Sequence, residues 1–238
     1  KLRAAGRLTP RGVIVKTDVT TALVDQMARA NNITCIGDLL VGFKYVAEEM
    51  NRLESAGRGS DFIFGCEESH GYLTGTYARD KDAAGAAVWI AEYAAELKRQ
   101  GQTLVDALEE IYAGYGYCHN HLTEIRLLGA KGMEQIAAIM EHFRGRTIER
   151  FGDFTVAEKV DRWQGAPQPH LSETDTSARN VIILRLRNVP ATTHLRVTVR
   201  PSGTEPKIKM YFELVGKPCP RRELAAAQQA LVDVRQRL

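Results

Sequence analysis

The stretch GVIVKTDVTTALVDQMARANNITCIG, residues 12–37, contains two short apolar, β-branched runs with a helical pattern between them. The runs Gly12–Lys16 and Ile33–Gly37 are typical of buried strands. In the intervening segment apolar residues recur at helical spacing, and Thr20 or Thr21 can cap the helix. A strand, a helix and a second strand in this order predict a parallel α/β unit.

The same alternation continues through the first part of the chain. We expect a helix over Phe43–Leu53, a strand over Asp61–Cys66, an Ala-rich helix from about Ala83 to Arg99 and a further helix opened by a capping box at Thr103 and Asp106. These elements predict an α/β domain with a parallel sheet over residues 1–145. Ligands of such a domain bind beyond the carboxyl ends of the strands.

The sequence changes character after Phe143. A charged, Gly-bearing segment, 144–152, is expected to act as a hinge, and a Pro-, Ser- and Thr-rich stretch follows at 164–178. Three runs then alternate with a period of two, and a last amphipathic helix ends near Leu238: the runs are Val181–Arg187, His194–Arg200 and Lys207–Val215. We therefore predict a smaller α+β domain over residues 146–238, with an antiparallel sheet and a helix packed on it.

Composition limits the possible classes of protein. The 238 residues are 44% apolar and 26% charged, as in ordinary globular proteins, and no apolar run approaches the length that crosses a bilayer. The net charge is +3 and no block of Lys and Arg residues occurs, so we expect neither a membrane nor a nucleic acid as a partner. The small excess of positive charge leaves nucleic-acid binding as a weaker alternative. Four scattered cysteines without ligand spacing favour the reducing cytoplasm.

The segment RPSGTEPK, residues 200–207, joins two predicted strands and has the chemistry of an anion-binding hairpin. Arg200 offers a planar fork of donors, and Lys207 adds positive charge. Ser202 and Thr204 add hydroxyl donors, while Gly203 lets backbone N–H groups approach an anion closely. A tight hairpin with a solvated basic rim is the alternative that the chemistry alone leaves open.

RPSGTEPK resembles the phosphate-binding signature of the α-D-phosphohexomutases, the phosphoglucomutase/phosphomannomutase family. The segment GCEESHG, residues 65–71, is similar to the family's sugar-binding loop, and GFKY, 42–45, and ARDKD, 78–82, match motifs of its bacterial α-phosphoglucomutase and phosphopentomutase branch. The resemblance covers nearly the whole chain, as the third and fourth of four family domains. In the family loop the His usually follows the Gly, whereas here His70 precedes Gly71.

The resemblance implies roles for individual residues. Glu67 and Ser69 would hold sugar hydroxyls. The distal phosphate would be bound by the hairpin residues Arg200, Ser202, Gly203, Thr204 and Lys207. Arg79 would contact phosphate, whereas Lys16 and Lys44 would contact phosphate or assist proton transfer. No metal ligand is expected in this chain; His119 and His121 are expected to be ordinary sites.

The family's reaction moves a phosphoryl group between C1 and C6 of a hexose through a phosphoserine and a bisphosphorylated sugar, with magnesium on an Asp-rich loop. Neither a TASHNP-like serine loop nor a DGDxDR-like metal loop occurs in these residues. We therefore expect a C-terminal fragment that is inactive by itself and has sugar phosphates and the N-terminal half of a parent enzyme as partners. Glucose, mannose, glucosamine or a pentose remain open as the sugar, and a free-standing sugar-phosphate-binding module is the alternative function.

Overall fold

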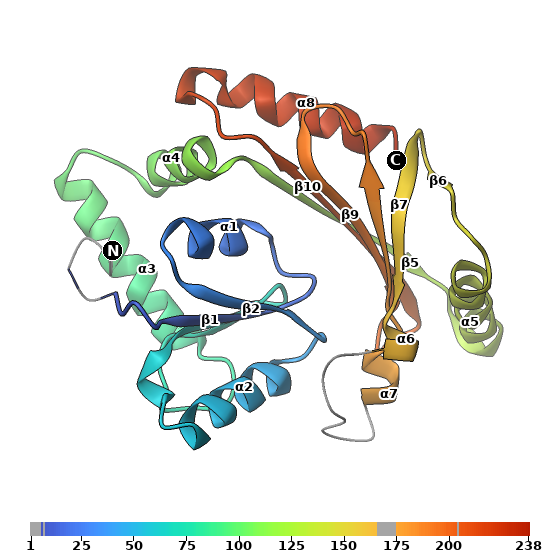
Figure 1. The fold of residues 1–238 in the computed structure, drawn as a ribbon, viewed down its shortest axis with the longest axis horizontal. Coiled ribbons are helices and arrows are strands. Elements are labelled where there is room, and N and C mark those ends of the chain that lie inside the picture. Colours follow the sequence, from blue (N-terminus) through green and yellow to red (C-terminus); the bar gives the residue numbers. More distant parts are fainter. Residues whose placement is uncertain (1–5, 7, 166–174, 204) are drawn as a thin grey trace. The chain divides into compact units, whose positions relative to one another are not determined.

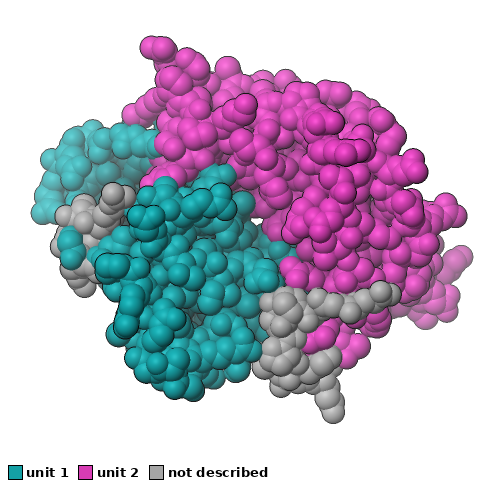
Figure 2. Space-filling view, viewed as in Figure 1, with its two compact units in different colours: residues 1–110 teal, residues 111–238 magenta. Residues whose placement is uncertain are grey.

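The structure is a computed structural model that describes residues 6, 8–165, 175–203 and 205–238. The chain divides into two compact units, Lys1–Glu110 and Ile111–Leu238, which Figure 2 shows in different colours. No helix in the described part of the chain is both long and apolar enough to span a membrane.

Unit 1 is built on a four-stranded sheet with the strand order β2-β1-β3-β4. Strand β1 runs parallel to β2 and to β3, and β4 returns antiparallel to β3. The elements are β1 (Val13–Thr17), α1 (Leu23–Ala30), β2 (Thr34–Leu39), α2 (Phe43–Ser55), a 3-10 turn (Gly59–Asp61), β3 (Phe62–Glu67), β4 (Gly71–Leu73), α3 (Ala83–Arg99) and α4 (Leu104–Tyr115). The predicted parallel α/β arrangement is confirmed, and β4 adds an antiparallel edge that the sequence analysis did not include.

Helix α2 shows how the apolar pattern builds the core of this unit. Its residues Phe43, Val46, Met50 and Leu53 are spaced three or four apart, so they share one face, and all four are buried. This face packs on β1 and β3. The central strand β1 contributes Val13 and Val15, which are 2% and 0% exposed. The packing fixes the carboxyl ends of β1 and β3, where the candidate site residues lie.

Unit 2 is built on a six-stranded sheet with the order β5-β10-β9-β8-β7-β6, in which every neighbouring pair is antiparallel. The elements are β5 (Cys118–Arg126), α5 (Gly129–Gly145), β6 (Arg150–Phe151), β7 (Phe154–Asp161), α6 (Arg162–Gly165), α7 (Asp175–Ala178), β8 (Ile182–Arg187), β9 (Thr192–Pro201), β10 (Lys207–Gly216), a 3-10 turn (Arg221–Glu223) and α8 (Leu224–Gln236). The predicted α+β class with an antiparallel sheet is confirmed.

Alternation along the strands separates the two faces of this sheet. Val197 and Val199 of β9 join Met140 of α5 and Leu231 of α8 in one core, so both helices cover the same face. Figure 1 shows α8 lying along β10 and β9. Thr198 lies between the two valines and Arg200 follows them, so both lie on the opposite face. We call it the helix-free face because neither α5 nor α8 packs on it.

The compact units divide between Glu110 and Ile111, inside α4, whereas the sequence analysis placed the domain boundary after residue 145. The difference is the segment that contains β5 and α5. Strand β5 pairs with β10 along its whole length, and α5 inserts Met140 into the core of unit 2. The sequence of β5, CHNHLTEIR, contains so many polar residues that it does not stand out as a strand. We predicted neither β5 nor α5, nor the strands β6 and β7.

The expected hinge at 144–152 lies wholly inside unit 2, so it does not connect the two units and this prediction is wrong. Arg144 bonds Asp161 of β7 at 2.9 Å through Nε. Val156 donates its N–H to the Glu149 carbonyl. These contacts tie the segment to the sheet.

Candidate functional site

The predicted sugar-binding loop is the turn between β3 and β4. Glu67 is the last residue of β3 and pairs with Gly71, the first residue of β4, so Glu68, Ser69 and His70 form the turn. His70 has a φ of 58°, a left-handed conformation that lets three residues reverse the chain. The loop therefore lies at the carboxyl end of a parallel strand, where α/β domains bind their ligands.

Glu67 is the buried anchor of this loop. It is 4% exposed, and its Oε1 is ion-paired with the ammonium of Lys81. Gly71 is required beside it, because a Cβ there would collide with the Glu67 Cγ. The lysine is held in place through its neighbour Asp82, which caps α3 by accepting from the Gly85 N–H and donates its own N–H to the Tyr72 carbonyl. The hydrogen bond from Tyr77 lowers the pKa of Asp82.

Lys81 is the residue that the sequence analysis left out of the site. Its position in ARDKD gave a signal, since that motif follows the sugar loop, but only the structure shows which carboxylate it meets. A carboxylate with a cation on one side keeps its remaining lone pairs directed away from that cation, where they accept from hydroxyl groups. The Glu67–Lys81 pair is therefore a preorganised acceptor.

The other two polar residues of the turn differ in role. Glu68 accepts a hydrogen bond from the Thr17 hydroxyl at 3.3 Å, so it points back toward β1. Ser69 is exposed, and its hydroxyl donates to Glu68 Oε1 at 3.4 Å. Ser69 is thus accessible at the predicted position, next to Glu67.

Lys16 lies at the end of β1, as predicted, but it is buried. It is 2% exposed, and its ammonium bonds the Asp25 carboxylate at 2.9 Å and the Thr20 carbonyl at 3.0 Å. Burial raises the pKa of the two nearby thiols, Cys35 and Cys66, to about 12 each. In this structure Lys16 has an internal carboxylate partner and is not presented to solvent.

Lys44 and Arg79 are both associated with α2. Lys44 lies in the first turn of the helix, with its ammonium 5.1 Å from the centre of the Tyr45 ring. Arg79 forms an ion pair with Glu54 and donates to the Asn51 Oδ1 at 2.9 Å. The guanidinium of Arg79 thus connects its loop to α2. This is a structural contact, and the predicted phosphate contact of Arg79 did not include it.

In unit 2 the RPSGTEPK segment is the turn between β9 and β10. Ser202 donates its N–H to the Lys207 carbonyl at 2.8 Å, and Lys207 donates its N–H to the Glu205 carbonyl at 2.8 Å. A Cβ at Gly203 would meet nothing within 4 Å, so the turn is open there. Thr204 lies outside the described residues. The segment thus joins β9 and β10 as a hairpin, and the two N–H groups of Ser202 and Lys207 are used within it.

Arg200 is the buried donor beside this turn. It is 8% exposed, and within the described part of the chain its Nε has no hydrogen-bond partner. Register places Arg200 opposite Lys209 of β10, which in turn lies opposite Glu124 of β5. These three residues lie in a row across the helix-free face, and a buried donor without a partner is expensive to maintain unless a ligand uses it.

Lys207 lies on the same face with two carboxylate partners. Its ammonium is 2.6 Å from Glu205 Oε2 and 3.1 Å from each oxygen of Glu124. The hydrogen bonds that the Lys207 ammonium donates to Glu205 and to Glu124 raise the pKa of Lys207, and those same contacts lower the pKa of both carboxyls. Lys209 adds a longer contact to Glu124 at 3.5 Å.

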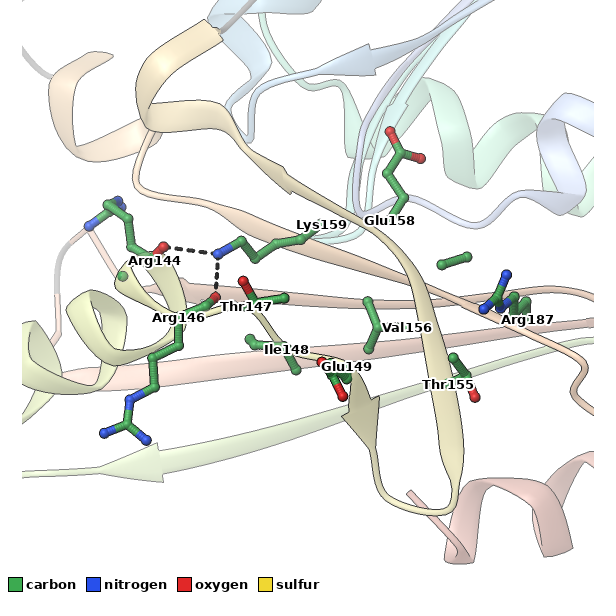
Figure 3. A pocket seen from close by; sticks show the side chains of 12 residues that line it. Arg144, Arg146, Thr147, Ile148, Glu149, Thr155, Val156, Glu158, Lys159 and Arg187 are labelled. Carbon is green, nitrogen blue, oxygen red and sulfur yellow. Dashed lines mark hydrogen bonds between the residues drawn. The ribbon is translucent and has the colours of Figure 1, made fainter.

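A surface hollow of about 640 Å³ lies elsewhere in unit 2, between the end of α5 and β7. Figure 3 shows Lys159 reaching across it, and its ammonium donates to the carbonyls of Arg144 and Arg146 at 2.9 and 2.6 Å and to that of Phe143 at 3.2 Å. Lys159 therefore caps the C-terminal end of α5. None of the predicted ligand residues lines this hollow.

The described residues contain no group of three or more His, Cys, Asp or Glu side chains that could hold a metal ion. His119 and His121 stack with their ring centroids 6.4 Å apart on β5. Burial lowers the pKa of both rings, and Arg235 lowers it further.

Comparison with known proteins gives consistent results. Residues 1–115 match the profile described as phosphoglucomutase/phosphomannomutase, alpha/beta/alpha domain III. The phosphoglucomutase of Staphylococcus aureus strain MSSA476 is 34% identical over 209 residues, and that of strain MRSA252 is 33% identical over 210. Each match covers 85% of this chain and 36% of the relative, so the chain spans little more than a third of the length of these relatives.

Two solved structures share the fold. The open form of pp63/parafusin (phosphoglucomutase) from Paramecium aligns with a TM-score of 0.54 at 18% identity, covering 94% of this chain and 38% of that one. A protein assigned as a phosphomannomutase from Thermus thermophilus aligns with a TM-score of 0.53 at 16% identity, covering 97% and 38%. The matching domain profile and the similarity to the S. aureus enzymes show that this chain belongs to the phosphoglucomutase/phosphomannomutase family of α-D-phosphohexomutases.

Proposed function

We propose that this chain is the sugar- and phosphate-binding C-terminal half of a longer isomerase, corresponding to the family's third and fourth domains. That enzyme interconverts sugar 1-phosphates and 6-phosphates, with glucose or mannose as the sugar. Support comes from the relatives named phosphoglucomutase and from the small share of their length that the chain spans. A parent that acts mainly on a pentose or on glucosamine is the alternative within the same chemistry.

The observation that carries the proposal is Arg200. Its guanidinium is buried at the base of the hairpin, and its Nε lacks a partner among the described residues. Leaving a buried N–H donor unpaired costs roughly 1–3 kcal/mol, and more when the group is charged. A phosphate oxygen at this position would remove that cost and complete a charge-assisted hydrogen bond.

The Glu67–Lys81 pair supplies the complementary function in unit 1. Its carboxylate is buried and oriented, and Ser69 stands exposed next to it. We assign sugar hydroxyls to Glu67 and Ser69 and the distal phosphate to the hairpin. Lys16 and Lys44 stay as proposed phosphate or proton-transfer contacts, with Lys16 first having to leave Asp25.

The rest of the reaction lies outside this chain in our proposal. The parent's N-terminal half carries the phosphoserine and holds magnesium, and a sugar bisphosphate is the intermediate and activator, in the cytoplasm. The 238 residues alone then bind sugar phosphates without converting them. Adding a separately expressed N-terminal half should restore turnover, and a chain that remains a binder with every such partner would be a free-standing module.

The direct experiment compares two arginines of the helix-free face. Arg200→Ala should weaken binding of glucose 6-phosphate by roughly 1.5–3 kcal/mol, the scale of a hydrogen bond to a charged group. Arg185→Ala is the matched control, because Arg185 is half-exposed and has its own carboxylate partner, Glu158, at 2.5 Å. Calorimetric titration of both variants tests the assignment, and equal affinities for Arg200→Ala and the unaltered chain would refute it.

A further inference from the structure

The hairpin of unit 2 carries its own anion next to the proposed phosphate site. Glu205 belongs to the turn itself, and its Oε2 is 2.6 Å from the ammonium of Lys207. Its other oxygen, Oε1, is 4.0 Å from the Arg126 guanidinium. The Glu205 carboxylate is thus already paired with Lys207, one of the cations that the proposed function assigns to phosphate binding.

The two carboxylates on Lys207 are held in different ways. Glu124 is part of β5, contacts the ammonium with both oxygens at 3.1 Å and also lies 3.5 Å from Lys209. Glu205 holds the ammonium with one oxygen, and its side chain is 48% exposed. Because a half-exposed carboxylate is hydrated again with little cost when it leaves, Glu205 is the exchangeable partner and Glu124 the permanent one.

Lys207 keeps one counter-ion when Glu205 leaves, because Glu124 contacts its ammonium with both oxygens. The side chain of Lys207 is 8% exposed, so its charge is largely removed from water. Charges in such places are paired. When a phosphate group enters the hairpin, it can take over the role of Glu205 and in addition use Arg200, whose Nε is unpartnered among the described residues.

We propose that Glu205 is the resident counter-ion of the hairpin and that a dianionic phosphate group binds by taking its place on Lys207. This inference rests on the proposed function of the hairpin. The exchange keeps Lys207 paired in both states. Because Glu205 competes for Lys207, phosphate binds more weakly than it would to the cations Arg126, Arg200, Lys207 and Lys209 without that carboxylate. The bound phosphate therefore dissociates readily. A sugar bisphosphate that must turn around in the site requires such release.

Sulfate is a suitable probe because it remains a dianion across the pH range in which carboxyl groups titrate. In the 238-residue chain, Glu205→Gln should tighten sulfate binding about two- to fivefold, the scale of one partly exposed ion pair. Glu158→Gln is the matched control, since Glu158 is 52% exposed and pairs with Arg185 on the same sheet. Its sulfate affinity should equal that of the unaltered chain.

Loss of a repelling charge near the site would also tighten binding, so a double-mutant cycle separates the two causes. If Glu205 competes for Lys207, then Glu205→Gln should have little further effect in a Lys207→Met background. A gain of the same size in both backgrounds would overturn the exchange, as would unchanged or weaker sulfate binding by Glu205→Gln alone.

Carbon-13 NMR of the glutamate carboxyls provides a measurement that needs no substitution. The pKa of Glu205 is held low by Lys207. It should rise when sulfate saturates the site, whereas the pKa of Glu124 should remain low; a Glu205 pKa that stays low in saturating sulfate would overturn the proposal. If sulfate binds neither the unaltered chain nor Glu205→Gln, or if binding survives Arg200→Ala, the proposed function of the hairpin fails as well.

Discussion

Replacing Glu67 by Gln removes the charge of the buried carboxylate but keeps the shape of the side chain. The carboxylate is 4% exposed and its partner Lys81 has a side chain 41% exposed, so only one member of the pair is fully removed from water. Breaking a completely buried pair costs roughly 3–5 kcal/mol. With one partner half in solvent, we expect unit 1 to lose roughly 1–2 kcal/mol of its free energy of unfolding.

The chain has two tryptophans, Trp89 on α3 of unit 1 and Trp163 in unit 2. Tryptophan fluorescence can therefore be made to report the unfolding of one unit alone. A Trp163→Phe background leaves Trp89 fluorescence to report the urea unfolding of unit 1. Glu67→Gln, Lys81→Gln and the double variant form a cycle in which the double loss should be smaller than the sum of the single losses by about 1 kcal/mol. Additive losses would show that the ion pair contributes nothing.

The same variant tests the proposed function of the loop. Glu67→Gln should reduce the preference for glucose 6-phosphate over inorganic phosphate and leave the affinity for inorganic phosphate unchanged, because the hairpin belongs to the other unit. If this variant weakens phosphate binding as much as Arg200→Ala does, the proposed division between hydroxyl and phosphate binding is incorrect.

The remaining predictions concern stability, pH and turnover. Lys159→Met should destabilise unit 2 by about 1–2 kcal/mol in denaturant unfolding, because three carbonyls at the end of α5 lose a charged donor; an unchanged midpoint would remove Lys159 as a cap. Gly71→Ala should lower the stability of unit 1 at least as much as Glu67→Gln, since the new methyl group collides with the Glu67 side chain. The folded-state pKa of His119 and His121 lies below the unfolded value of about 6.5, so the unfolded chain takes up protons first as pH falls. These two histidines should therefore leave stability unchanged above about pH 6.5 and lower it below that pH, and His119→Gln should flatten that decline in unfolding curves taken across the range. In a coupled assay with glucose 1-phosphate, bisphosphate and magnesium, the chain should show no turnover, and activity in a preparation free of host mutase would mean that another residue carries the phosphoryl group.

Local patterns were sufficient to predict most of unit 1. The run at Gly12–Lys16 is largely apolar on both faces, as a central parallel strand requires, and β1 forms there between β2 and β3. The run at Ile33–Gly37 predicted β2, which is an edge strand of the sheet. Lys16 was placed correctly at the end of its strand. Its burial against Asp25 could not be predicted, because that contact depends on how α1 crosses the sheet.

Unit 2 was harder because its first strand is separated from the rest of its sheet by a long stretch of sequence. β5 pairs with β10, whose partner residues lie far along the chain, and such non-local pairing leaves no mark in a local pattern. The period of two in His194–Arg200 did predict which residues share the face of Arg200. It could not predict that Glu124 lies beside Lys209 on the same face, because that position depends on the register in which β5 pairs with β10.

That missing strand changes the chemistry assigned to the hairpin. In the sequence of residues 200–209, Lys207 and Lys209 add two positive charges to that of Arg200, and the turn looks strongly basic. With β5 in place, Glu124 contacts both lysines, and Glu205 takes a further contact on Lys207. The Nε of Arg200 has no partner in the described part of the chain, so in our proposal the attraction for phosphate depends on this arginine and on the exchange of Glu205. A site of that kind holds a phosphate by geometry more than by net charge, and its affinity should therefore fall less with added salt than that of a turn with three free cations.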